Sequence, residues 1–338
     1  MATHNAMPRY FVNLEEDTKA FDRPNRVNLQ DFQSGQRHSP NVSAYDMEAM
    51  TLNTGSGNRL VVKLNESIGA GRYATVYRGQ LGYARRGEMI NVAVKIANND
   101  EESKAELENE MELLQHLDNV DKVISLLDEC TLPMGETAGV FELADRTLAQ
   151  VLFSDEYSLD LVQALNWGIQ LHTVIQSCVD QDIAHLDIKP QNILLVHDDL
   201  RLADFGNAQR ISSHQSLRIG TLAYTPPEVL CSNTPKFDRP SIASYQVYSA
   251  AATMYAILTG QVPFSCIQDY GIRLMMALKQ GFFVGDHNCW PQDRMIPAAL
   301  RSLIETCTHR DPTLRPSPGT VVRELKKILA VIRGGEPG

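Results

Sequence analysis

The run from His185 to Asn192 places residue types that phosphoryl transfer requires on one short stretch of chain. Asp187, Lys189 and Asn192 supply a carboxylate, an ammonium and a carboxamide, and Asp204 adds a second carboxylate further on. Such groups can orient an attacking hydroxyl, steady a moving phosphate and provide the hard oxygen ligands that magnesium prefers. An Asp and an Asn a few residues apart mean little alone, but this complete string predicts a site for phosphoryl transfer.

The predicted secondary structure explains how these groups come together. The apolar runs 193–196 and 200–203 flank a polar turn, which indicates a strand-turn-strand that carries the chain to Asp204. A long amphipathic segment over 159–179 predicts a helix that delivers the loop containing Asp187.

A glycine-rich stretch lies between two predicted strands, 60–64 and 76–79. Gly69, Ala70 and Gly71 occupy this stretch, and glycines allow a backbone to approach phosphate oxygens closely with its N–H groups. A glycine pair in a hairpin is more often only a turn, so this stretch alone is weak evidence for nucleotide binding.

Lys95 stands inside an apolar strand predicted over 91–97. A buried ammonium is costly unless it is paired, so we expect a carboxylate partner. The helix predicted over 101–117 carries several glutamates, of which Glu110 borders the apolar stripe. We therefore predict an ion pair between Lys95 and Glu110. The other glutamates near the stripe are expected to face solvent, namely Glu106, Glu108 and Glu112.

These features resemble the eukaryotic-type protein kinases over about residues 58–333. The glycine-rich stretch matches the family pattern G-x-G-x-x-G-x-V, except that Ala74 replaces the third glycine. The segment 220–228 resembles the substrate-positioning loop that ends in A-P-E, with Pro226 in place of the alanine, and Arg315 matches the partner of its glutamate. The resemblance implies an α+β, bilobal fold, in which a small β-rich lobe with one key helix covers a larger α-helical lobe and ATP lies between them.

The resemblance also implies a role for each site residue. Asp187 would be the base or positioning group for the acceptor hydroxyl, Lys189 would steady the transferred phosphoryl group, and Thr221 would contact both. Asn192 and Asp204 would hold magnesium. The nucleotide-binding set would consist of Gly69, Ala70, Gly71, Val76, Ala93, Lys95, Glu110 and the hinge backbone at Glu142 and Ala144. The expected packing residues around these groups are Phe141, His185 and Phe205.

Two departures from the family pattern bear on regulation and rate. Leu186 stands where most regulated kinases carry an arginine that binds a phosphate on the activation loop. Leucine cannot bind phosphate, so phosphorylation of that loop is not expected to switch activity through residue 186. Gln246, Tyr248 and Ala251 replace residues of the pattern D-x-W-S-x-G, and a glutamine keeps only the acceptor oxygen of the Asp that anchors the catalytic loop. The hydroxyl groups of the activation loop belong to Ser212, Ser213, Ser216, Thr221 and Thr225.

Composition and charge argue against several classes of protein. The chain has 338 residues, a formal net charge of −10 and a pI near 5.4, without the basic stripe of a nucleic-acid-binding protein. Its six cysteines form no C-x-x-C pair, which favours reduced thiols in an intracellular protein, cytoplasmic or nuclear. We find no apolar run as long as a membrane span and no signal peptide, so we expect no membrane partner. The oligomeric state stays open.

The chain divides into three parts by composition. Residues 1–57 are polar, show no persistent strand or helix period and end in a Gly-, Ser- and Asn-rich stretch, so we interpret them as a flexible N-terminal segment. Residues 58–333 form the predicted kinase domain, with its small lobe over about 58–143 and its large lobe over about 144–333. Residues 334–338 form a short tail.

The predicted function is an ATP-dependent protein kinase that transfers the γ-phosphoryl group of Mg-ATP to serine or threonine hydroxyls of protein substrates. The strings 189–192 and 220–221 resemble the serine/threonine branch rather than the tyrosine branch. Two alternatives stay open, a pseudokinase that binds ATP without efficient turnover and a kinase of a small molecule. The segment 221–228 and Arg315 disfavour the second, because small-molecule phosphotransferases with a similar catalytic loop lack that pair.

Overall fold

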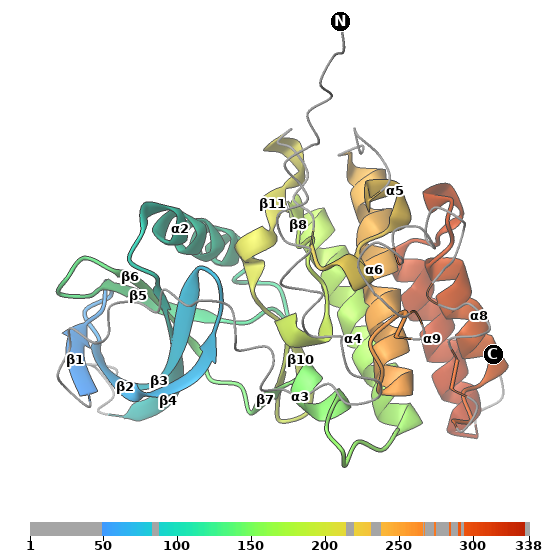
Figure 1. Ribbon diagram of the computed structural model, residues 1–338, viewed down its shortest axis with the longest axis horizontal. Coiled ribbons are helices and arrows are strands. Elements are labelled where there is room, and N and C mark those ends of the chain that lie inside the picture. The colour runs from blue at the N-terminus through green and yellow to red at the C-terminus, as the bar shows by residue number, and fades with distance from the viewer. Residues whose placement is uncertain are drawn as a thin grey trace, which may run out of the picture.

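A curled β-sheet with one long helix faces a bundle of helices, and the predicted catalytic loop lies where these two lobes meet (Figure 1). The computed structural model describes residues 49–82, 88–213, 220–230, 238–265 and 294–334, together with Ile267, Leu274, Val284, Trp290 and Pro291. This is the bilobal α+β architecture that the sequence predicts.

The small lobe is built on an antiparallel sheet with the strand order β1-β2-β3-β4-β6-β5. Buried and more exposed residues alternate along β3 and β4, as expected for strands that cover a core with one face. Apolar side chains such as Leu60, Val62 and Leu81 line that core. The strands are β1 Ala49–Asn53, β2 Arg59–Ala70, β3 Ala74–Gly82, β4 Met89–Ala97, β5 Leu126–Thr131 and β6 Thr137–Glu142.

The small lobe begins earlier than the sequence indicated. Residues 49–53 form β1, which pairs along its whole length with β2. The turn after β1 is held by a carboxylate far along the chain, since Thr54 Oγ1 and Asn58 Nδ2 both donate hydrogen bonds to Asp128 on β5.

The prediction of a flexible segment is therefore corrected for residues 49–57, which belong to the sheet and its first turn. The polar stretch looked like a linker because its hydrogen-bond partner is remote in sequence. Residues 1–48 lie outside the described part of the chain.

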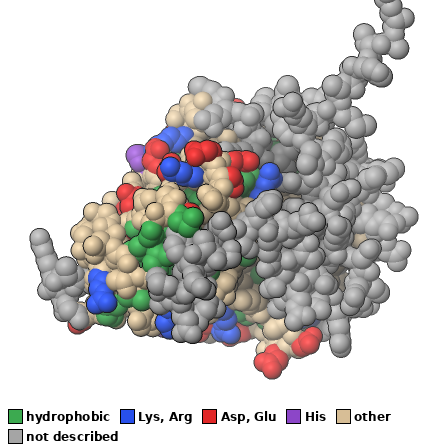
Figure 2. All heavy atoms as spheres, turned by 60° about the vertical axis from the view of Figure 1, so that its left-hand side comes forward, with side chains coloured by type: hydrophobic (Ala, Val, Ile, Leu, Met, Phe, Trp, Pro, Cys, Tyr) green, Lys and Arg blue, Asp and Glu red, His purple; other side chains and the backbone are tan. Residues whose placement is uncertain are grey.

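Helix α2, Glu101–His116, packs on the sheet with Glu110 turned inward. Asp100 caps its N-terminus and accepts a hydrogen bond from the N–H of Ser103 over 2.8 Å. In the described part of the surface that Figure 2 shows, acidic and basic side chains lie side by side and form no patch of one sign. The apolar residues that α2 buries include Leu107, Met111, Leu113 and Leu114.

Only the end of the apolar run 123–127 belongs to a strand, because β5 begins at Leu126. Val123 and Ile124 contact the large lobe, because the N–H of Ile124 donates to the carbonyl of Leu202 over 2.9 Å and Val123 bridges the same residue. Val123 and Ile124 are buried and Leu126 and Leu127 are half-buried, so part of this run joins the two lobes rather than extending the sheet.

Two long helices, α4 and α6, form the centre of the large lobe (Figure 1). Nearly every residue of α6 from Ile242 onward is buried, and Gly168 of α4 allows close approach because a Cβ there would lie 2.5 Å from Sδ of Met254. The helices are α3 Leu148–Leu152, α4 Leu161–Asp180, α5 Pro227–Leu230, α6 Arg239–Thr259, α8 Ala298–Cys307 and α9 Pro318–Ile332. Short strands join them, namely β7 Arg146–Thr147, β8 Ile183–Ala184, β9 Ile193–Val196, β10 Asp199–Leu202 and β11 Gln209–Arg210.

The cysteines and the apolar helices can be compared with the sequence predictions. Cys130 of the small lobe and Cys178 and Cys307 of the large lobe are buried free thiols, as predicted, and the other cysteines lie outside the described residues. Within residues 271–281, only Leu274 is described. None of the helices in the ranges given above is both long and apolar enough to span a membrane.

His172 is buried in the middle of α4, with 1% of its surface exposed. Its Nδ1 lies 2.9 Å from the carbonyl oxygen of Gly168, which can only accept a hydrogen bond, so Nδ1 carries the proton. Among the described residues, Nε2 has no hydrogen-bond partner. A second proton on Nε2 would place an unpaired charge in the core, and burial accordingly lowers the pKa of His172 to about 4.

Protonation of His172 should destabilise the fold in acid. Its ordinary pKa is 6.5, so between pH 6.5 and about 4 the unfolded chain binds a proton that the folded chain does not. The contribution to stability is therefore intact above pH 6.5 and is lost as the pH falls. We expect the free energy of unfolding to decrease by about 2 kcal/mol between about pH 7.5 and 5 through this group.

Denaturant titrations at the two pH values would measure this effect. His172→Leu should remove that part of the pH dependence, whereas His197→Asn, in an exposed turn, should retain it. An unchanged pH dependence in His172→Leu would contradict the assignment.

Candidate functional site

Lys95 lies at the centre of a charge network between the two lobes. Its Nζ is 2.6 Å from Oε2 of Glu110 on α2 and 3.0 Å from Oδ1 of Asp204, which follows β10. The side chains of Lys95 and Glu110 are 20% and 4% exposed, so the predicted ion pair is present and largely buried. The contact with Asp204 connects the sheet to the large lobe, and no feature of the sequence signals it.

Lys95 and Asp204 hold each other ionised, whereas burial raises the pKa of Glu110 against the opposing charge of Lys95. Burial opposes the charge on Lys95, but the carboxylates of Asp204 and Glu110 outweigh it and raise the pKa of the ammonium. The charge of Lys95 lowers the pKa of Asp204 to about 2, against the opposing effect of burial. Glu110 also accepts a hydrogen bond from the N–H of Phe205 over 3.2 Å. One cation is thus shared by two carboxylates, and the surplus negative charge suits a metal ion.

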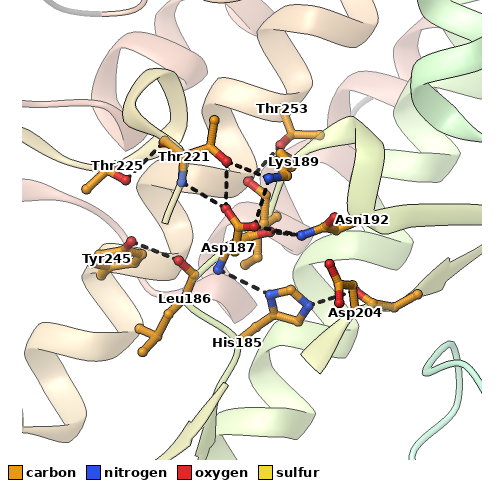
Figure 3. A network of polar contacts seen from close by, with 12 residues as sticks. His185, Leu186, Asp187, Lys189, Asn192, Asp204, Thr221, Thr225, Tyr245 and Thr253 are labelled. Atoms are coloured by element: carbon orange, nitrogen blue, oxygen red, sulfur yellow. Dashed lines mark hydrogen bonds and ion pairs between the residues drawn. The ribbon is translucent and has the colours of Figure 1, made fainter. Parts of the chain in front are cut away.

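The carboxylate of Asp187 accepts hydrogen bonds from several elements of the large lobe (Figure 3). Oδ1 accepts from the N–H and from the hydroxyl of Thr221, each over 2.9 Å. Oδ2 accepts from Nζ of Lys189 and from Nδ2 of Asn192, also over 2.9 Å each. Nζ of Lys189 in turn lies 2.6 Å from Oγ1 of Thr221. The contacts that the sequence predicted for Thr221 are therefore present.

This environment favours the ionised form of Asp187. Burial alone would raise the pKa of Asp187, but Lys189 and the N–H of Thr221 hold that pKa below its ordinary value. Such a carboxylate is a weak base at neutral pH. It is suited to accepting a hydrogen bond from a hydroxyl and orienting it for attack, with proton transfer late in the reaction.

Asn192 and Asp204, the predicted magnesium ligands, come from the catalytic loop and from the segment after β10. Nδ2 of Asn192 donates to the carbonyl and to the carboxylate of Asp187, which fixes the amide orientation and directs Oδ1 away from Asp187. The side chain of Asp204 is 51% exposed. These oxygens suit the pattern in which magnesium takes one or two protein ligands and completes its shell with phosphate and water.

Protein side chains alone do not complete such a site. Within the described ranges, no three His, Cys, Asp or Glu side chains gather closely enough to hold a metal ion. A magnesium ion here would therefore depend on oxygens from a bound phosphate, and the role of the pair stays a prediction.

The glycine-rich stretch forms the end of the β2–β3 hairpin. Gly69 pairs with Val76, and Ala70 pairs with Thr75. A Cβ added to Gly69 or Gly71 would meet nothing closer than 3.8 and 3.6 Å, and neither residue has a positive φ. The contacts of the protein itself do not demand glycine at these positions. Close approach of a ligand such as phosphate would demand it.

The remaining residues of the predicted nucleotide set lie on neighbouring strands. Val76 is the cross-strand partner of Lys95, and Ala93 is that of Phe141, which is buried in the main core as expected. These positions place the set on three adjacent strands, β3, β4 and β6, next to the charge network.

The predicted hinge follows β6. The side chain of Glu142 accepts a hydrogen bond from the N–H of Ser125 over 2.9 Å and lies 3.5 Å from Nε of Arg201 on β10. This ion pair holds the end of β6 against the large lobe, and Ala144 follows half-buried in the linking chain. Sequence reasoning missed Arg201, because a single arginine on a short strand gives no signal of its partner.

His185 connects the catalytic loop to its surroundings, in addition to the packing that the sequence predicts. Its Nδ1 accepts from the N–H of Asp187 over 3.3 Å, and its Nε2 donates to the carbonyl of Ala203 over 3.0 Å. Burial lowers the pKa of the imidazole, so it is neutral with its proton on Nε2. The ring also packs edge-on against Phe205. His185 thus fixes the backbone that precedes both Asp187 and Asp204.

Gln246 of α6 anchors the catalytic loop from the other side. Its Oε1 accepts the N–H of His185 over 2.8 Å, which is the acceptor function predicted for it. Its Nε2 is buried and finds no partner among the described residues. The substitution of the family Asp therefore keeps one hydrogen bond of the anchor and leaves one polar group buried without compensation.

Leu186 is fully buried in an apolar cluster, as the sequence predicts. Its backbone has a φ of 66°, which is unusual for a residue with a side chain, and the hydroxyl of Tyr245 donates to its carbonyl over 2.9 Å. We name this group the Leu186 cluster; its members are Val179, Ala184, Leu186, Ile211, Val229, Ile242 and Tyr245. The cluster joins both ends of the activation segment to α4, α6 and the catalytic loop.

Polar contacts hold the start of the same segment. Ser212 donates from its N–H and its hydroxyl to Oδ2 of Asp182, and Nη2 of Arg239 lies 3.4 Å from Oδ1. Arg210 of β11 lies 3.3 Å from Glu112 on α2. Glu112 faces solvent, as predicted, and the ion pair with Arg210 is an addition that the sequence did not indicate. Ser216 lies outside the described residues.

Arg315 forms the predicted ion pair with Glu228 at the far end of the segment. Both terminal nitrogens of its guanidinium lie 2.7 Å from the two carboxylate oxygens, and its side chain is fully buried. The guanidinium also stacks over the ring of Tyr248, at 4.9 Å from the ring centroid. A bidentate pair of this kind fixes the segment geometrically as well as electrostatically.

The two lobes, the shared Lys95 cation and the loop around Asp187 define a bilobal phosphotransferase fold. The chain belongs to the protein kinase family, since the family described as "Protein kinase domain" matches residues 62–326.

Similar proteins cover most of this domain. "Putative mitogen-activated protein kinase kinase kinase 7-like" of Drosophila melanogaster is 28% identical over 284 residues, 79% of this chain and 65% of that protein. "Serine/threonine-protein kinase ULK3" of Xenopus laevis is 31% identical over 268 residues, 75% of this chain and 52% of that protein. "Serine/threonine-protein kinase mos" of Patiria pectinifera is 29% identical over 212 residues, 59% of this chain and 57% of that protein. The chain therefore spans between about half and two thirds of these relatives.

Gly220 must be glycine for the activation segment to lie on the catalytic loop. A Cβ there would lie 2.3 Å from the carbonyl oxygen of Leu186 and 2.9 Å from Oδ1 of Asp187. We predict that Gly220→Ala lowers the free energy of unfolding by about 1–3 kcal/mol, the usual cost of overpacking. Denaturant titration would measure the change. The control is Gly319→Ala in α9, where a Cβ meets nothing within 4 Å, and equal stability of the two variants would contradict this packing.

Proposed function

We propose that this chain is an active, ATP-dependent protein kinase that transfers the γ-phosphoryl group of Mg-ATP to serine and threonine hydroxyls of proteins. One observation carries the proposal: two polar networks lie close together where the two lobes meet (Figure 3). Lys95 joins Glu110 and Asp204 in the first, and Asp187 joins Lys189, Asn192 and Thr221 in the second. The names of two of the relatives given above, both called serine/threonine-protein kinases, support the same conclusion.

Each group has a task in this proposal. The glycine-rich loop and Lys95 bind the nucleotide phosphates, and Asn192 and Asp204 hold magnesium. When bound, Mg-ATP supplies the transferable phosphoryl group and the metal charge that offsets its negative charge. Asp187 accepts the hydrogen bond of the attacking hydroxyl and takes its proton, while Lys189 stabilises charge on the phosphoryl oxygens.

The acceptor side of the cleft favours a protein hydroxyl. Thr221 stands between Asp187 and Lys189, and the segment that carries it is fixed by the bidentate pair of Arg315 with Glu228. A rigid segment beside the acceptor position suits an extended polypeptide better than a small metabolite. This supports protein rather than small-molecule substrates.

Incubation with labelled ATP and a generic basic protein, with and without magnesium, tests the proposal. We expect magnesium-dependent labelling, with phosphoserine and phosphothreonine after acid hydrolysis. ATP binding without labelled protein would favour the pseudokinase alternative, for which the unpartnered Nε2 of Gln246 gives a physical reason. Labelling of a small molecule alone would favour the alternative of a small-molecule kinase.

Substitution of Lys95 or Asp204 should lower the rate of phosphoryl transfer sharply. Lys95→Met should reduce kcat by about 10²–10³-fold, the usual effect of removing one electrostatic donor. Asp204→Ala should lower it by at least about 100-fold, because a metal ligand and a partner of Lys95 are lost together. The matched controls are Lys326→Met and Asp118→Ala, both exposed and remote from the cleft. Near-normal turnover in either site variant would contradict the assignment.

The Leu186 cluster predicts activity without phosphorylation of the activation segment. Protein made in bacteria and treated with phosphatase should stay active, because the segment is held by apolar contacts and by Asp182 rather than by a phosphate. Alanine at Ser212, Ser213 and Ser216 together should change the rate by no more than about twofold, because the N–H of Ser212 still donates to Asp182 and the Leu186 cluster is unchanged. Loss of activity on phosphatase treatment, with recovery after an activating kinase, would contradict this.

A further inference from the structure

The tip of the glycine-rich loop is held by Asn98, which lies just after β4 and three residues beyond Lys95. Nδ2 of Asn98 donates to the carbonyl oxygen of Arg72 over 2.6 Å, and its backbone N–H donates to the carbonyl of Tyr73 over 2.9 Å. The residue is 6% exposed. Two successive carbonyl groups of the loop are thus drawn toward one residue.

The orientation of the Asn98 amide is fixed by its partner. A carbonyl oxygen can only accept, so the atom that faces Arg72 must be the NH₂ group. Oδ1 is buried and has no hydrogen-bond partner within the described residues. An amide whose oxygen stays unsatisfied carries a cost, so the donor function toward Arg72 is the feature that explains this side chain.

These two contacts also determine where the N–H groups of the loop point. In a planar trans peptide the C=O and the following N–H point in opposite directions. Because the carbonyls of Arg72 and Tyr73 face Asn98, the N–H groups of Tyr73 and Ala74 point away from it. Gly71 donates to the carbonyl of Ala74 over 2.8 Å and closes the turn.

We propose that Asn98 is a positioning residue, which sets the peptide planes of the glycine-rich loop so that the N–H groups of Tyr73 and Ala74 face the phosphates of a bound nucleotide. The inference rests on the proposed function, because it assigns the loop to nucleotide phosphates.

The contact further connects the loop to the junction between β4 and α2. Arg72 lies 3.9 Å from Glu102 in the first turn of α2, and its guanidinium stacks over Tyr73 at 4.9 Å from the ring centroid. Both side chains of the ion pair are more than half exposed, so Asn98 rather than this pair is the main restraint. The tip of the loop is therefore connected through Asn98 to the end of β4, the strand that carries Lys95.

Binding measurements on the full chain separate this role from general destabilisation. The probes are Mg-ATP, Mg-ADP and adenosine, measured by calorimetry with wild type, Asn98→Ala and Asn98→Asp. The first variant removes the side-chain donor, and the second directs a carboxylate at the Arg72 carbonyl without changing the side-chain volume. We expect affinity for both phosphate-bearing ligands to fall about three- to tenfold, while adenosine affinity stays within about twofold.

The matched control is Asn91→Ala at the exposed start of the same strand, which should bind all three ligands as wild type does. Because Asn98 is buried, each variant is first compared with wild type by thermal unfolding. If Asn98→Ala is unstable, Asn98→Ser replaces it, since it keeps the backbone N–H and loses the reach to Arg72.

The outcomes distinguish this proposal from the proposed activity. Equal losses for ATP and adenosine, or no loss for ATP, would overturn the role of Asn98. Wild-type protein that binds Mg-ATP but transfers no phosphate would overturn the activity alone, and the affinity differences would still test Asn98. A wild type without affinity for nucleotide phosphate would overturn both.

Discussion

The structure depends on the partial burial of one cation, the ammonium of Lys95, which must be paired where it lies. Its partners come from two separate elements, Glu110 on α2 and Asp204 after β10. Because both carboxylates must reach the ammonium of Lys95, these ion pairs constrain the position of α2 and the approach of the two lobes. The pair also explains why an otherwise apolar strand tolerates a lysine, and why the site carries more negative than positive charge before any ligand is considered.

The large lobe supports the catalytic loop, whose backbone is strained at Leu186. Leu186 has a positive φ, which is unfavourable for a residue with a side chain, so surrounding contacts must hold the loop in this conformation. Tyr245 binds its carbonyl, Gln246 binds the preceding N–H of His185, and the Leu186 cluster fills the space beneath. The central helix α6 therefore acts as the template on which the catalytic loop is held, through three contacts that differ in chemistry.

Apolar periodicity predicted most helices and strands, and the need to pair a buried ammonium predicted the ion pair of Lys95. The two lobes and the ion pair of Arg315 with Glu228 were predicted from the resemblance to protein kinases. The sequence did not predict that residues 49–57 join the sheet, since the partner of that turn is Asp128, remote in sequence. The sequence also did not predict contacts such as those of Asn98. They depend on which carbonyl a side chain reaches in the folded molecule, and no spacing along the chain records that.

The Leu186 cluster changes how the activation segment responds to its surroundings. An arginine paired with a phosphate is an electrostatic contact, which salt screens and which a phosphatase can remove. Apolar packing is insensitive to moderate ionic strength, and it weakens on cooling because the hydrophobic effect loses strength at low temperature. Because Ile211 and Val229 pack in one cluster, we expect the order of these two positions to respond to temperature more than to phosphorylation.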